Sequence, residues 1–263
     1  MPGSLSAPYC PCVPETASNC RLSLRRRQQT KAFLATSPNQ LIERLPRAAR
    51  SRLIALCDPH PLVLAEILSE AGSTTRHVYF PTDGFISLVS VIDGSPGIEV
   101  GMVGQEGMLG AHLALGVASQ PLHALVQGAG TALRINARAF RAELSQSPAL
   151  QSAVARYLHV LMTQLAISTA CVRFHSVQPR LARWLLMTQD RAVSNSFHVT
   201  HEFLAYMLGV RRVGITSAAS ALRRDGLISY HRGHVTVLDR KGLEAAACTC
   251  YAADCRSYAA VMG

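Results

Sequence analysis

The stretch from residue 199 to residue 237 constrains the fold of this 263-residue chain more than any other. Thr200 is a good helix N-cap, because its hydroxyl can accept a hydrogen bond from a backbone N–H of the first turn. Leu204 begins an apolar face, Ala205 is small enough for another helix to cross closely, and Gly209 can adopt a left-handed conformation. The pattern predicts a short helix that ends in a sharp turn.

A second helix is expected directly after this turn. Its apolar stripe is Val210, Ile215 and Ala218, and polar residues occupy its other faces. Asp225-Gly226 is a turn and C-cap signal, so the helix should stop there and a strand should begin at Leu227-Ile228. The segment His231-Arg232-Gly233-His234 is then expected to be the turn of a small β-wing.

This stretch resembles the winged helix-turn-helix of Crp/Fnr-type bacterial transcription regulators. The resemblance implies an α+β chain with an antiparallel β-roll (jelly-roll-like) sensor domain, a long dimerisation helix and a DNA-binding domain. It also implies a homodimer that binds double-stranded DNA at a pseudo-palindromic operator and contacts RNA polymerase, with no enzymatic activity. An ordinary helical hairpin with a solvated basic face is the alternative for this stretch alone.

Composition agrees with a polyanionic partner. The formal net charge is +10, which favours nucleic acid, although an anionic membrane surface would also attract such a chain. No run approaches the about 18 apolar residues that a membrane-spanning helix needs, so we expect a cytoplasmic protein with no membrane partner. The eight cysteines do not have the distribution of a small secreted disulfide scaffold.

Residues 1–37 are expected to be a disordered basic extension. Five basic residues stand there against the single acid Glu15, and proline, serine and cysteine interrupt any amphipathic helix. An organellar transit peptide or a start codon assigned too far upstream would give a similar segment.

Residues 38–146 have the pattern of the β-roll sensor domain. Apolar residues between Asn39 and Leu56 predict one or two short leading helices. Residues 85–92 are apolar or small on both alternating faces, which is typical of a strand buried on both sides, and residues 98–103 form the returning strand of a hairpin. Two further short strands are expected at residues 122–126 and 131–135.

Glycines recur at every third position in this domain, at Gly101, Gly104, Gly107 and Gly110. A phosphate-binding loop would need a following Lys-Ser/Thr or a βαβ pattern, and neither is present. We therefore expect these glycines to form tight turns at the corners of the roll.

The resemblance implies a pocket that in cyclic-nucleotide-binding members carries a glutamate for the ribose and an arginine for the cyclic phosphate. Here Ala111 or His112 stands at the place of the glutamate, and Gln120-Pro121 at the place of the arginine. Without a cation to pair with the phosphate, a partly buried cyclic nucleotide would be held poorly. The effector is therefore unknown and is not expected to be cyclic AMP.

Residues 147–175 are expected to be one long helix, with Ser147 as N-cap and Pro148 in the first turn. Its apolar positions repeat at spacings of four and three, which predicts a heptad seam against a partner helix. The seam consists of Leu150, Val154, Tyr157, Leu161, Leu165, Ser168 and Val172. The alternative is that the helix packs on its own roll, for which Leu158 and Met162 offer a second apolar face. By resemblance, this helix is the dimer axis and Arg173 to Pro179 is the hinge to the DNA-binding domain at residues 176–247.

Arg212 matches the recognition-helix arginine that reads guanine in the resembled family, and a guanidinium can contact O6 and N7 of guanine together. The family often has glutamate and a second arginine where this chain has Val213 and Ser217, so its operator should differ. Phosphate contacts are expected from other residues of the second helix and the wing, although a solvated basic face would look alike. The expected DNA-binding residues are Arg211, Arg212, Thr216, Ser217, Arg223 and Arg232.

The cysteines suggest alternative functions. Cys248, Cys250 and Cys255, in the tail at residues 248–263, could bind metal with a fourth ligand, but this C-x-C-x4-C pattern is weaker than paired C-x2-C motifs. The N-terminal Cys10, Cys12 and Cys20 do not have the spacing of the family's iron–sulfur members. A redox- or metal-sensing regulator is therefore the second hypothesis, and no metal site is assigned from the sequence.

An enzyme is the third hypothesis. Cys171 and His175 are four residues apart on the expected long helix and could form a thiolate pair, as in nucleophilic catalysis. No third orienting group or oxyanion site is visible, and packing near the hinge is the preferred explanation of the pair. No catalytic residue is assigned.

Overall fold

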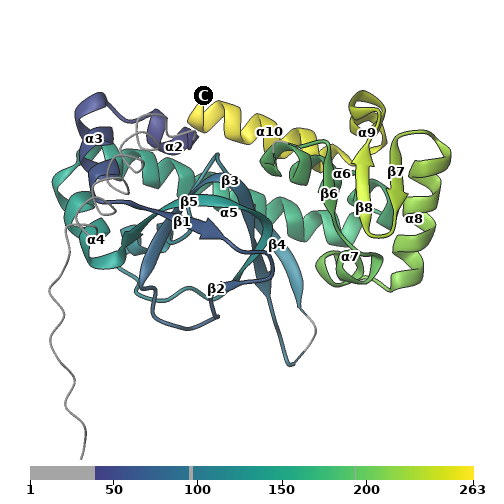
Figure 1. Ribbon diagram of the computed structural model, residues 1–263, viewed down its shortest axis with the longest axis horizontal. Coiled ribbons are helices and arrows are strands. Elements are labelled where there is room, and N and C mark those ends of the chain that lie inside the picture. Colours follow the sequence, from purple (N-terminus) through teal and green to yellow (C-terminus); the bar gives the residue numbers. More distant parts are fainter. Residues whose placement is uncertain (1–38, 95–96, 193) are drawn as a thin grey trace, which may run out of the picture. The chain divides into compact units, whose positions relative to one another are not determined.

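The computed structural model describes residues 39–94, 97–192 and 194–263, so the expected extension at residues 1–37 lies outside the described residues. The described chain is α+β (Figure 1). Its elements are α2 (Gln40–Glu43), α3 (Arg47–Ala55), β1 (Asp58–Leu62), β2 (Ile67–Ser69), β3 (His77–Ser90), β4 (Ile98–Val103), the 3-10 helix η1 (Ala111–Leu115), β5 (His123–Asn136), α4 (Ala137–Gln146), α5 (Pro148–Phe174), α6 (Val177–Ala192), β6 (Ser196–His198), α7 (His201–Leu208), α8 (Arg212–Arg224), β7 (Ile228–His231), β8 (His234–Val237), α9 (Arg240–Ala246) and α10 (Thr249–Met262).

The first sheet is antiparallel and has the strand order β1-β5-β3-β4, with β2 also paired to β5. Strand β3 is buried on both faces over most of its length, as predicted, but it ends at Ser90, and the exposed Val91 and Ile92 lie outside it. Strand β4 covers residues 98–103, as predicted. The prediction of two short strands at residues 122–126 and 131–135 was wrong, because β5 is continuous. Gly128 and Gly130 explain the difference: a side chain at either position would collide with β3, and without one the strand bulges and continues.

The glycines between β4 and η1 allow side chains of helices α5 and α6 to pack directly against the backbone of this loop. At Gly107, an added Cβ would lie 2.2 Å from the aromatic ring of Tyr157 on α5. At Gly104 it would lie 2.7 Å from the side chain of Arg191 on α6. Three of the four regularly spaced glycines lie at turns, as predicted: the N–H of Gly107 donates to the carbonyl of Gly104 across one turn, and Gly110 has a φ of 98° in the next. Gly101 lies within β4, so the prediction was wrong there. Because Gly104 and Gly107 have no side chain, α5 and α6 can lie close to this part of the β-roll.

We predict that Gly107→Ala destabilises the protein by about 1–3 kcal/mol, because the new methyl group has no space beside the buried Tyr157 ring. Urea denaturation followed by circular dichroism measures the loss. In a Tyr157→Ala background the same substitution should cost less, since the obstructing ring is gone. An equal cost in both backgrounds would show that the ring contact is not the cause.

Helix α5 begins as the sequence predicts and ends at the expected hinge. The Ser147 side chain accepts a hydrogen bond from the N–H of Leu150, and Pro148 occupies the first helical position. The helix stops at Phe174, and α6 starts at Val177 after a break at only two residues. Within the described residues, no helix is both long and apolar enough to cross a membrane.

The seam predicted on α5 is largely an intramolecular face. Leu150, Val154, Tyr157 and Ser168 are buried within the chain itself, so their assignment to a partner helix was wrong. The sequence could not distinguish the two apolar faces of the helix, because both have helical periodicity. The structure leaves the second face, which includes the 67% exposed Met162, on the surface.

The C-terminal segment is a helix, α10, and not only a tail. It packs against α5 and α6. Asp254 of α10 forms a salt bridge of 2.7 Å with the buried Arg183 of α6, and Arg183 also donates a hydrogen bond to Ser168 of α5. One guanidinium therefore connects the three helices.

Candidate functional site

Helices α7 and α8 form the predicted helix-turn-helix. The Thr200 hydroxyl accepts a hydrogen bond from the N–H of Phe203, and Gly209 caps α7 with a φ of 62°. Leu204, Ile215 and the small residues of α8 pack with α6 in one core cluster. The buried stripe fixes which side of α8 remains in contact with solvent.

All six residues expected to contact DNA are exposed. Arg211 is the N-cap of α8, and Arg212 is its first residue. Thr216, Ser217 and Arg223 lie further along the outward side of this helix, so the structure brings five of the six onto one element (Figure 1). Among the described residues, none of the four arginines of the set forms a salt bridge. Their charges are available to an external anion.

The sixth residue, Arg232, lies in the wing. Strands β7 and β8 pair antiparallel and are joined by Arg232 and Gly233, which have φ values of 48° and 82°. Positive φ at both positions is typical of the two-residue hairpin turn whose twist matches that of the flanking strands. Because an arginine rarely adopts this conformation, the exposed guanidinium is carried at some conformational cost. The turn presents it at the tip of the wing.

Thr216 has a second role that the sequence did not indicate. Its hydroxyl hydrogen-bonds His201 Nδ1 of α7 at 3.1 Å and also donates to the carbonyl of Arg212. The His201 ring in turn lies 4.3 Å from the ring of Tyr230 in the wing. Burial, followed by the nearby charge of Arg212, lowers the pKa of His201. Thr216 thus helps to join α7, α8 and the wing.

Val213 is a surface residue that sequence reasoning did not include among the contacts. It is 72% exposed and stands beside Arg212 in the first turn of α8. An apolar side chain here can contact the methyl group of thymine in a major groove. The only sequence signal was the departure from the family's glutamate at this position.

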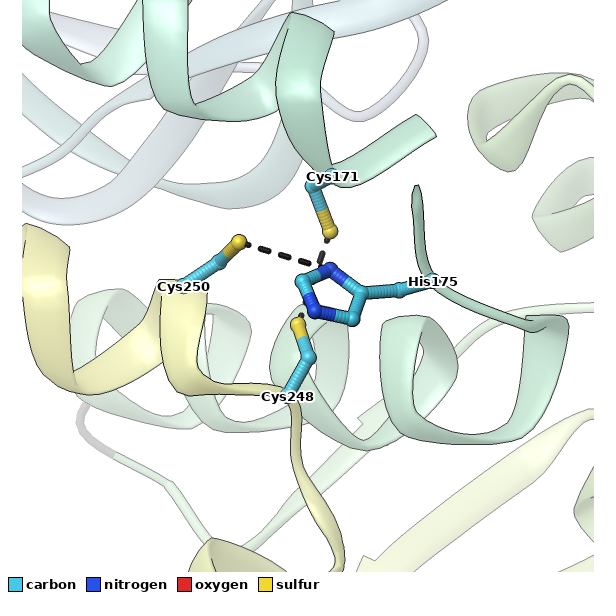
Figure 2. A group of neighbouring side chains, drawn as sticks. All are labelled: Cys171, His175, Cys248 and Cys250. Atoms are coloured by element: carbon cyan, nitrogen blue, oxygen red, sulfur yellow. Dashed lines mark hydrogen bonds between the residues drawn. The ribbon is translucent and has the colours of Figure 1, made fainter. Parts of the chain in front are cut away.

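A second group of side chains gathers where α5 ends and α10 begins. Cys171 of α5, His175 after it, Cys248 before α10 and Cys250 in the first turn of α10 point toward one another (Figure 2). Their sulfur and nitrogen ligand atoms all lie within 4.8 Å of one another. We call these four residues the Cys3His cluster. Its three cysteines are buried, and His175 is half-buried.

Two close contacts define the Cys3His cluster. The sulfurs of Cys171 and Cys248 are 3.5 Å apart, and the sulfur of Cys250 is 3.6 Å from His175 Nδ1. The hydrogen bond with Cys248 is the main cause that lowers the pKa of Cys171 to about 5, with burial opposing and Arg183 assisting. The pKa of Cys248 is raised, first because its thiol shares this hydrogen bond and then because of burial. One thiolate in the cluster is therefore favoured near neutral pH.

The structure brings together residues that the sequence had suggested for two separate sites. The Cys171–His175 pair and two of the three tail cysteines meet although 77 positions separate Cys171 from Cys248. Cys255 is exposed and does not belong to the cluster. The N-terminal cysteines lie outside the described residues. Neither half of the cluster was a strong motif alone, and the sequence had no signal that joined them.

Comparison with known families identifies the C-terminal domain. Residues 179–246 match the Crp-like helix-turn-helix domain, which spans α6 to α9 and contains both helices and the wing described above. No curated protein sequence was found to match the chain.

Solved structures similar to this chain share its fold over nearly their whole length. A CRP-family transcriptional regulator from Thermus thermophilus is 23% identical, with a TM-score of 0.59 over 72% of this chain and 96% of that chain. FixK2 from Bradyrhizobium japonicum is 12% identical, with a TM-score of 0.61 over 73% and 98%. A putative Crp/Fnr-family regulator from Eubacterium rectale is 20% identical, with a TM-score of 0.57 over 78% and 96%.

Proposed function

Since this chain has the β-roll and helix-turn-helix fold of Crp/Fnr-type transcription regulators and a Crp-like helix-turn-helix domain at residues 179–246, we propose that it binds a specific DNA sequence as a homodimer and regulates transcription there. Helix α8 enters the major groove, and the wing contacts the backbone of the same half-site. RNA polymerase is the proposed protein partner, and the cytoplasm is the proposed location.

The basic surface of α8 and the wing, whose arginines form no salt bridge with any described residue, is the observation that supports this function most. Arg211, Arg212 and Arg223 project from one helix, and Arg232 projects from the adjacent turn. Exposed arginines without carboxylate partners suit a polyanion, because they displace condensed counterions and donate to phosphate oxygens. A net charge of +10 for the whole chain favours the same partner.

We predict that Arg212→Ala weakens binding to the preferred operator by about 1–3 kcal/mol and relaxes selection at one base pair. The reason is that Arg212, at the N-terminal end of α8, is placed to read a guanine. The operator is first selected from random DNA with the purified protein. Gel shifts on that operator and on its single-base variants then measure both effects.

Arg232→Ala is the matched comparison in the wing. If this residue contacts phosphate, its loss should weaken all sequences alike and make the slope of log K against log salt shallower by about 0.9 for each contact removed. Arg141→Ala, an exposed change on α4, should alter neither property. An Arg212→Ala protein that keeps full base preference while losing affinity for every sequence would contradict the placement of α8.

We propose that the outward stripe of α5 forms the homodimer contact. Leu158, Met162, Leu165, Thr169 and Val172 repeat at spacings of four and three, and each is half-buried or exposed in the single chain. A heptad stripe of this kind buries its apolar side chains best against a second copy of the same helix. Two-fold pairing would place the two α8 helices on half-sites about 34 Å apart, one turn of B-DNA.

We expect Met162→Glu to convert the dimer to a monomer at micromolar concentration, because a carboxylate at the centre of the stripe would be desolvated opposite its symmetry mate. Light scattering coupled to size-exclusion chromatography measures the mass. Arg156→Glu, at an exposed position of α5 outside the stripe, is the control and should remain dimeric. A dimeric Met162→Glu protein would rule out this face.

The effector is proposed not to be cyclic AMP. Ala111 is a buried residue at the start of η1, and the buried Gln120 offers an amide where an arginine would pair with the cyclic phosphate. Titration calorimetry should therefore detect no saturable binding of cyclic AMP to the purified chain. Binding with micromolar affinity would contradict this prediction.

A further inference from the structure

We propose that the Cys3His cluster is a zinc site that fastens the end of α5 to the start of α10. Three sulfurs and one imidazole nitrogen are a full tetrahedral ligand set for Zn²⁺, and sites of this composition are closed and structural. This inference concerns metal binding alone and does not depend on the proposed DNA binding.

The distances fit the proposed ion. With Zn–S bonds of about 2.3 Å and a Zn–N bond of about 2.0–2.1 Å, a tetrahedron has edges of about 3.8 Å between sulfurs and about 3.6 Å between sulfur and nitrogen. The Cys171–Cys248 and Cys250–His175 contacts are 3.5 Å and 3.6 Å. The longer separations, up to 4.8 Å, require movements of about 1 Å to close the site. A disulfide between Cys171 and Cys248 would require a larger approach of the two sulfurs, to about 2.05 Å.

The charges around the Cys3His cluster also favour a bound metal. Three thiolates and one Zn²⁺ carry a net charge of −1, and a buried anion needs a compensating cation. Arg183 and Arg180 supply positive charge, because both interact electrostatically with Cys171 and Cys248. Arg183 is already paired with Asp254, whereas Arg180, only 7% exposed, has no carboxylate partner within the described residues and donates to the carbonyl of Leu208. An anionic zinc–thiolate centre would account for the buried Arg180.

The backbone around the cluster holds its ligands in fixed positions. The N–H of His175 donates to the carbonyl of Cys171, which closes the last turn of α5. The N–H of Cys248 donates to the carbonyl of Pro179 in α6, and Ile167 packs against the three cysteines. The four ligand atoms, which come from two segments far apart in the sequence, thus lie close together. Helix α6 begins directly after the first of these segments. A metal ion here would fix the hinge from which the DNA-binding domain continues.

The first test is metal content. We expect about one zinc per chain by mass spectrometry of the full-length protein, and loss of that zinc in Cys171→Ser, Cys248→Ser and His175→Ala. Cys255→Ser is the matched control, because this exposed cysteine lies on α10 but outside the cluster, and it should keep its zinc. The triple change of Cys10, Cys12 and Cys20 to serine should keep it too. Zinc retained by Cys248→Ser, or lost from either control, would overturn the assignment.

The second test does not require a variant to fold. Chelated wild-type protein is titrated with Co²⁺, which should give the intense visible absorption of a tetrahedral site and a thiolate-to-cobalt charge-transfer band, both displaced by Zn²⁺. Chelation should also lower the melting temperature of the wild type, because the ion binds only the folded chain. A pale octahedral cobalt spectrum, or a Cys171–Cys248 disulfide in freshly purified metal-free protein, would contradict a zinc site.

Discussion

The close packing of helix α5 against the β-roll is the contact on which the rest of the described structure depends. Gly107 lacks a side chain where the ring of Tyr157 lies, and the Gln164 side chain accepts a hydrogen bond from the N–H of Met102 in β4. These contacts determine which side of α5 is buried. Because a helix has only one side turned to its own domain, the stripe around Met162 is left on the surface, where a second copy could cover it.

Arginines serve two different purposes in this chain, and their surroundings separate them. Arg183 and Arg191 are buried and paired with Asp254 and Glu106, so their charges are neutralised inside the structure and hold α6 to its neighbours. The arginines of α8 and the wing are exposed and form no salt bridge within the described residues. Exposed cations remain solvated at low cost until a polyanion replaces the water. This contrast links the charge of the sequence to the proposed function.

The break between α5 and α6 lies next to the proposed zinc site and also leads into the proposed DNA-binding domain. Cys171 lies in the last turn of α5 and His175 directly follows this helix, whereas Cys248 precedes α10 and Cys250 lies in its first turn. A metal held there would restrict the backbone at the position where the chain passes from the β-roll to the DNA-binding domain. This position is a short break at His175 and Ser176, which separates α5 from α6.

The sequence by itself determined the features that depend on near neighbours: the cap at Thr200, the turn at Gly209, and the start of the long helix at Ser147 and Pro148. Helical periodicity separates the buried stripe of α8 from its outer side, so the sequence also placed five of the six expected DNA-binding residues on the exposed side of this helix. The turn signal placed the sixth, Arg232, in the exposed turn of the wing. Only the tertiary structure decided three other features. These are the face of α5 that is buried, the close packing at the recurring glycines, and the grouping of the cysteines. These features depend on contacts between residues far apart in the chain, such as Gly107 with Tyr157 and Cys171 with Cys248. A local sequence pattern does not predict which distant segments come into contact.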